Sequence, residues 1–152
     1  MRTYIFKISL LYSSPKIAPC GPEISREIEI PENTNLYRLA KAIVNAYNFN
    51  FDHCFGFFSK IDEWKYFDSP KKYELFTDLI EEGEDLESTG AGSVKKTKIN
   101  EVWQNIGDKM MFLFDYGDNW QFLVELINCG NKELKQKYPR FLKKIGRAPK
   151  QY

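Results

Sequence analysis

The segment LFDYGDNWQF, residues 113–122, places two aspartates and a glycine inside an aromatic run. Asp115 and Asp118 lie three residues apart across a predicted tight turn, and two such carboxylates can share a hard divalent cation. An aspartate two residues before a turn glycine also has a structural use, because its side chain can accept backbone N–H groups of the turn. The two roles are compatible, since a carboxylate held by backbone donors is already oriented for a ligand.

Two further polar side chains occupy apolar positions of predicted strands. Arg26 shares its phase with the isoleucines of residues 24–30, and His53 shares its phase with the phenylalanines of residues 51–57. A charge on an apolar strand face must be paired or lie at the rim. Structural explanations are a rim position or an ion pair for Arg26, and a hydrogen bond in the core for His53.

These misplaced polar residues are also a candidate binding site if they converge at one end of the sheet. That site consists of Arg26, His53, Asp115, Asp118 and Trp120. A metal-dependent enzyme or hydrolase using Asp115, Asp118 and His53 is the alternative to a binding site. It lacks an evident third oxygen ligand, and neither Cys54 nor Ser59 lies in a recognisable nucleophile elbow. We therefore expect no bound metal and no cofactor.

The elements that must position these residues are predicted from periodicity. Alternation predicts strands at residues 4–10, 24–30 and 51–59, with a short strand at 64–67. Two more strands, about 109–116 and 119–127, flank a two-residue loop in which Gly117 supplies the positive φ of a type II′ turn. That register puts Asp115 opposite Trp120 and Leu113 opposite Phe122, on one face with Met111, Val124 and Leu126.

Helices are predicted from caps and apolar stripes. Residues 33–49 carry the clearest stripe, with Asn33 or Thr34 as the cap. A second helix is predicted from a cap at Ser69 to just before Gly83, and Asn100 caps a short helical turn. The loop at 13–22 contains three prolines, and the tail begins helical before Pro139. The expected fold is α+β: a mostly antiparallel sheet of five to six strands (two hairpins) packed with one main helix and a second helix.

Composition limits the function classes. At 152 residues the chain is long enough for one domain, expected at 1–131, with a basic C-terminal segment at 132–152 packed on it or trailing from it. Net charge is +1, so no whole-molecule field favours nucleic acid or membrane. Acids nevertheless cluster at 78–87, and eight Lys or Arg residues stand against one acid in 132–150. Phosphate contacts by this tail would involve Lys143, Lys144 and Arg147.

The three cysteines show no CxxC spacing, and no apolar run is long enough for a membrane span or signal peptide. A cytoplasmic location and no membrane partner are expected.

Three segments resemble the plasmid pRiA4b ORF-3-like family, also labelled as TnpR-like passenger proteins of insertion elements. They are SREIEIP (25–31), FNFDHCFGF (49–57) and FDYGDNW (114–120), and the resemblance covers about residues 1–149. Arg26, His53, Asp115, Gly117, Asp118 and Trp120 match the family pattern. The chain departs from it at Phe122, where many members have histidine, and at Ser25, where a tryptophan usually precedes the arginine. The resemblance implies an α+β fold and an association with mobile elements in some members, and it brings no established reaction.

Three functions remain open. The first is a non-catalytic binding module for a protein or peptide, with nucleic acid as another partner through the basic tail. The second is the metal-dependent enzyme or hydrolase described above. The third is an assembly role, in which an exposed aromatic edge pairs with another copy.

Overall fold

A single antiparallel sheet organises the chain in the computed structural model, which describes residues 1–12 and 22–152. The strand order is β4-β3-β5-β6-β1-β2-β7. The strands are β1 (Arg2–Tyr12), β2 (Ser25–Pro31), β3 (Phe55–Phe58), β4 (Lys72–Glu74), β5 (Lys109–Phe114), β6 (Trp120–Asn131) and β7 (Arg140–Ile145). The helices are α1 (Leu36–Ala46), η1 (Tyr66–Asp68), α2 (Leu75–Glu81) and α3 (Ile99–Val102). The α+β class is confirmed, with seven strands in place of the expected five to six. The predicted loop at 13–22 and Cys20 lie outside the described residues, apart from Pro22.

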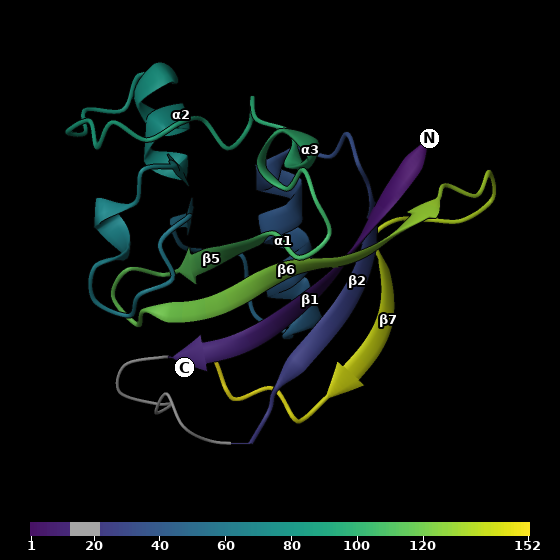
Figure 1. Cartoon of the computed structure of the whole chain (residues 1–152). Helices are drawn as coiled ribbons and strands as arrows, with labels where there is room; N and C mark the ends of the chain where they lie inside the picture. The colour runs from purple at the N-terminus through teal and green to yellow at the C-terminus, as the bar shows by residue number, and fades with distance from the viewer. Residues whose placement is uncertain (13–21) are drawn as a thin grey trace.

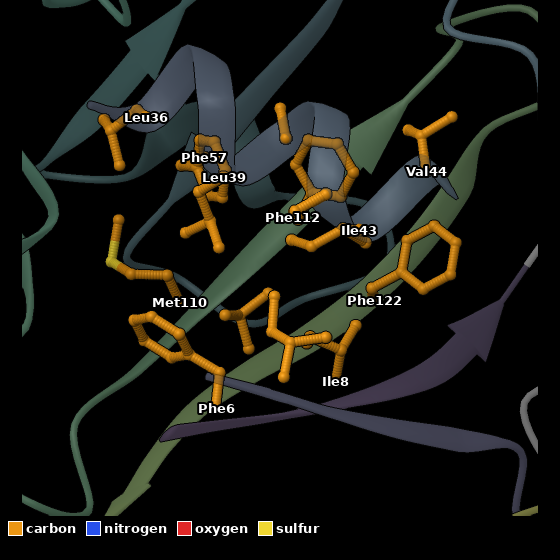
Figure 2. Close-up of a cluster of buried hydrophobic side chains, with 14 of the residues drawn as sticks. Phe6, Ile8, Leu36, Leu39, Ile43, Val44, Phe57, Met110, Phe112 and Phe122 are labelled. Atoms are coloured by element: carbon orange, nitrogen blue, oxygen red, sulfur yellow. The ribbon is translucent and has the colours of Figure 1, made fainter. Parts of the chain in front are cut away.

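Helix α1 packs across one face of the sheet and forms the core with it (Figure 1). Its apolar stripe includes Leu36, Leu39 and Ile43, which are fully buried. Figure 2 shows these side chains directed at phenylalanines of the strands, among them Phe112 and Phe122. The predicted helix is confirmed, but its cap is neither Asn33 nor Thr34. Asn35 is the cap, because its side chain accepts the N–H of Arg38 at 2.8 Å.

The predicted strand at 64–67 is wrong, because this segment is a turn that leads into η1. Asp62 Oδ1 accepts the N–H groups of Trp64 and Lys65 at 2.8 and 2.9 Å, which favours a turn. Ser69 does not cap a helix either. Its hydroxyl accepts the N–H of Lys60 at 2.9 Å, and the following residues pair with β3 as β4.

Helix α2 therefore begins later than predicted, at Leu75, although it ends just before Gly83 as expected. Lys98, not Asn100, precedes the first residue of α3. The tail also differs from the expectation of a helical start. Residues 132–139 contain only turns and bends, and residues 140–145 form β7, which pairs with β2.

The β5–β6 hairpin is confirmed, but its predicted register and turn are wrong. Phe114 pairs with Trp120 and Phe112 with Phe122, so residues 115–119 form a five-residue connection. Positive φ angles occur at Asp115 (66°) and Asn119 (57°). Gly117 therefore does not supply the left-handed conformation, and no type II′ turn forms. The shift by one residue moves Met111 and Leu113 to the opposite face, where they pack with Phe58.

Candidate functional site

Asp52, His53 and Asp115 meet at the end of β3 and β5. His53 Nδ1 lies 2.6 Å from Asp52 Oδ1, and His53 Nε2 lies 3.5 Å from Asp115 Oδ2. His53 precedes β3 and its side chain is 36% exposed, so a hydrogen-bonded core position is wrong for this residue. Both ring nitrogens face carboxylates, so two neighbours orient the imidazole.

Asp115 fixes the hairpin connection. Its Oδ1 accepts the N–H groups of Gly117 at 3.0 Å and Asp118 at 3.2 Å, and its own N–H donates to Cys54 O at 2.9 Å. The predicted structural use of this aspartate is confirmed. Aspartate also suits the positive φ here, because its short polar side chain can bond to nearby backbone.

The end of the chain packs beside this cluster. Gln151 brackets the backbone of Asn50, since its amide oxygen accepts Asn50 N–H at 2.7 Å and its amide nitrogen donates to Asn50 O at 3.1 Å. The Tyr152 hydroxyl donates to Asp52 Oδ2, which lowers the pKa of Asp52 and raises the pKa of Tyr152 to about 12. His53 also holds the pKa of Asp52 down through its hydrogen bond.

Of the other residues of the predicted site, Asp118 and Trp120 lie in or beside the hairpin connection, and Arg26 lies away from the His53 cluster. Trp120 is fully buried, with its ring 4.7 Å from that of Phe49, and Asp118 is half-buried in the connection. Arg26 lies on β2, which β6 and β1 separate from β5. Within the described residues it is neither at the rim nor in an ion pair: it is 4% exposed and donates to four backbone carbonyls.

The His53 cluster is poorly equipped to hold a metal ion. In the part of the chain that the structure describes, no three His, Cys, Asp or Glu side chains are grouped so as to ligate one. Asp115 Oδ1 is already engaged by two backbone donors. The geometry therefore supports a structural clamp at this end of the sheet.

A second surface is hollowed and strongly basic. A large cleft of about 1130 Å³ runs along the exposed side of α1, between the 94–98 segment and the β6–β7 connection. A small cleft of about 400 Å³ continues it between the end of α1 and β7, and Asn45 lines both. We call the two clefts together the basic trough. Its basic residues are Arg26, Arg38, Lys41, Lys95, Lys96, Lys98, Lys132, Lys143 and Lys144. Among the described residues, no Asp or Glu lines either cleft.

Two structural features place these cations. Arg38, Lys41 and Asn45 are spaced three and four residues apart, so they form one exposed stripe of α1 opposite its apolar stripe. Asp78 fixes the 93–98 loop, which is the wall of the large cleft facing α1. Its buried carboxylate accepts hydrogen bonds from the Ser93 hydroxyl at 2.5 Å and from Val94 N–H at 2.9 Å. That contact fixes the loop that carries Lys95, Lys96 and Lys98 into the large cleft.

The charge of the trough is only partly compensated. Lys95 pairs with Glu82 at 2.7 Å and Lys96 with Glu81 at 2.9 Å, and these contacts raise the pKa of both lysines. Within residues 1–12 and 22–152, no ion pair involves Arg38, Lys41, Lys98 or Lys132. The helix dipole adds positive potential at the start of α1, but Thr97 O and Val94 O already occupy its first N–H groups. Side chains must therefore make the contacts to an anion.

Of the basic-tail residues expected to touch a ligand, Lys143 and Lys144 line the small cleft, and Arg147 lines neither cleft. The large cleft was not predicted from the sequence. The one signal for it was the cationic pair at positions 38 and 41 on the polar side of a predicted helix.

Comparison with known proteins agrees with this fold. The sequence profile of the family described as plasmid pRiA4b ORF-3-like protein matches residues 2–151. The crystal structure of a protein of unknown function from Methanosarcina mazei Go1 superposes with a TM-score of 0.70 and 22% identity, covering 97% of this chain and 71% of that one. No curated protein sequence matches. None of the described helices is both long and apolar enough to cross a membrane.

Proposed function

The chain belongs to the plasmid pRiA4b ORF-3-like protein family, and we propose that this member is a non-catalytic module that binds an acidic segment of a partner protein. The observation that carries the proposal is the basic trough. It gathers cations from α1, the 94–98 segment and the β6–β7 region, while the whole chain has a net charge of only +1. Charge complementarity of this kind speeds association and selects the partner.

An acidic protein segment fits the trough better than nucleic acid does. Single strands bind where aromatic faces are open for base stacking. In the large cleft, Tyr37 has Lys95 Nζ 5.1 Å from its ring centroid and an edge contact with Phe51, so its ring is not open for stacking. The exposed ring of Phe141 lies in the small cleft instead. Glu81 and Glu82 lie next to the 94–98 wall, and these acids and the exposed ones that follow them in the chain would repel a long polyanion. A short acidic segment can stay within the trough.

The length of the trough suits an extended peptide. Helix α1 spans 11 residues, so its axis is about 16 Å long at about 1.5 Å per residue. About five residues of extended chain cover that distance. A partner segment of about ten residues would therefore span the large cleft and reach the small one.

The partner's origin and location are also part of the proposal. The family takes its name from a plasmid reading frame, which supports a partner encoded on a mobile element. Free thiols at Cys54 and Cys129 support a cytoplasmic location, because cysteines usually stay reduced there.

Fluorescence anisotropy with a labelled peptide of alternating Glu and Ser tests the function. We expect saturable binding that weakens with salt, and no binding of the matched Gln and Ser peptide. The double variant Arg38→Glu/Lys41→Glu should weaken binding by about tenfold or more, which is about 1.4 kcal/mol. The control variant Lys60→Glu/Lys65→Glu makes the same change in charge outside the trough and should bind normally.

Equal affinity of the two double variants would contradict the proposal. Tighter binding of a single-stranded oligonucleotide than of the acidic peptide would also contradict it and would favour nucleic acid as the partner.

A further inference from the structure

Arg26 is a buried cation without a carboxylate partner among the described residues. Its side chain is 4% exposed, and its Nε and Nη1 atoms donate only to backbone carbonyls, of Ser25, Ala46, Ile145 and Gly146. The Nη2 atom is buried and has no hydrogen-bond partner in the described chain. A buried guanidinium of this kind has an unused donor and an uncompensated charge, both of which an anion would satisfy.

Part of this arrangement has a structural explanation. Helix α1 has no basic residue in its last turn, and the bond from Arg26 Nε to Ala46 O at 3.1 Å supplies a cation to that end. The guanidinium carbon also lies 4.8 Å from the centroid of the Tyr47 ring. Neither contact uses Nη2, so the helix end does not account for the whole group.

Arg26 lines the small cleft together with two further cations, Lys143 and Lys144. The cleft volume of about 400 Å³ is within the range of pockets that hold small organic groups. Phe141 and Leu142, which are 57% and 41% exposed, form an apolar wall beside the cations. The cleft therefore offers cations for an anion and, next to them, apolar side chains for an apolar group.

We infer that the small cleft binds a carboxylate attached to an apolar group, with the Arg26 guanidinium as the cation at its base. This inference rests on the proposed function and sharpens it: the acidic partner segment would carry an acidic residue next to an aromatic or aliphatic one. The acidic residue binds to Arg26 and to Lys144, which pairs with Arg26 across β2 and β7, and its apolar neighbour packs on Phe141 and Leu142.

NMR titration of the ¹⁵N-labelled full chain with 3-phenylpropionate tests this site. We expect saturable shifts of the Arg26 guanidinium signals and of the amides at 45–48 and 141–144. The neutral analogue 3-phenylpropanamide should produce no such shifts. Phe141→Ser, on the exposed strand edge, should weaken 3-phenylpropionate binding by about tenfold, because the phenyl group of the ligand loses the apolar wall on which it packs. The same variant should bind acetate as the wild type does, since acetate has no phenyl group.

Replacement of Arg26 itself risks misfolding, so Lys144→Gln is the second variant, and it should weaken the binding of both 3-phenylpropionate and acetate. Equal binding of acid and amide, unchanged Arg26 signals, or binding of inorganic phosphate but not of 3-phenylpropionate would overturn the inference. If the acidic peptide binds through Arg38 and Lys41 while 3-phenylpropionate does not bind, only this inference fails. If 3-phenylpropionate binds and no acidic peptide does, the cleft is a small-molecule site and the proposed function fails.

Discussion

The two carboxylate oxygens of Asp115 make different contacts. One oxygen accepts the N–H groups of Gly117 and Asp118, and the other lies 3.5 Å from His53 Nε2. His53 in turn contacts Asp52, and Asp52 accepts a hydrogen bond from Tyr152 near the end of the chain. A single residue thus joins the hairpin connection, the segment before β3 and the final residues.

Replacing Asp115 should separate its backbone contacts from its charge. Asp115→Ala loses both N–H contacts and places alanine at a φ of 66°, so we expect a loss of about 2–4 kcal/mol in the free energy of unfolding. Asp115→Asn keeps an acceptor oxygen and tolerates that φ, so its loss should be less than about 1 kcal/mol. Chemical denaturation measures both, and equal losses would show that the turn does not depend on these contacts.

The contact between Tyr152 and Asp52 predicts a pH dependence. Since the folded-state pKa of Tyr152 is raised from 10.0 to about 12, the contact stabilises the docked end of the chain fully below pH 10.0 and is lost as the pH rises through about 12. The difference in ultraviolet absorbance between the wild type and Tyr152→Phe during an alkaline titration isolates this phenol. Its midpoint should fall toward 10.0 in Asp52→Asn, and a wild-type midpoint already near 10.0 would refute the contact.

At the scale of elements, the loop that carries Lys95, Lys96 and Lys98 depends on α2. Asp78 is 3% exposed and accepts Ser93 Oγ, Val94 N–H and Lys95 N–H, so the buried carboxylate replaces solvent for three donors. The acidic run at 78–87 is therefore not uniformly solvated, because its first member is a structural acceptor.

Removal of this acceptor should loosen one wall of the basic trough. In Asp78→Ala we expect amide hydrogen exchange at Val94 and Lys95 to rise by about tenfold or more, the equivalent of one lost charged hydrogen bond of about 1.5–3 kcal/mol. Asp85→Ala, an exposed acid of the same run, is the control and should leave exchange unchanged. Equal exchange in both variants would show that Asp78 does not hold the loop.

The elements with strong local signals were predictable from the sequence, and those set by distant partners were not. The apolar stripe of α1 and the paired apolar runs of β5 and β6 are local. The register of that hairpin was missed because Asp115 and Asn119, not Gly117, take positive φ. β7 was missed because only the open side of β2 makes a strand of residues 140–145.

In the candidate site, too, roles set by neighbouring residues could be predicted, and roles set by distant residues could not. The role of Asp115 as an acceptor for the turn could be predicted, because the acceptor and its donors lie within three residues of each other. Arg26 was placed wrongly, since its acceptors include Ala46 and Gly146, which are remote in sequence. The large cleft joins residues from 30 to 139, so composition alone could not reveal it.

Over the whole molecule, charge is segregated and not simply balanced. The net charge of +1 conceals a trough lined by cations, next to a segment rich in acids. The edge strand β7 carries Lys143 and Lys144 and a register shift opposite Glu27 and Ile28, and both features oppose pairing with a second copy. The molecule is therefore better suited to receiving an acidic partner than to assembling with itself through this edge.

Lysine footprinting tests the central claim most directly, because the chain carries its own controls. The wild type is acetylated with and without the acidic peptide, and the rate at each lysine is measured by mass spectrometry. We predict that the peptide slows acetylation of Lys41, Lys98 and Lys132, and leaves Lys60, Lys65 and Lys71 unchanged, since these last three line neither cleft. If the peptide changed the acetylation rate equally at all six lysines, or protected only residues 60–71, the account would be contradicted.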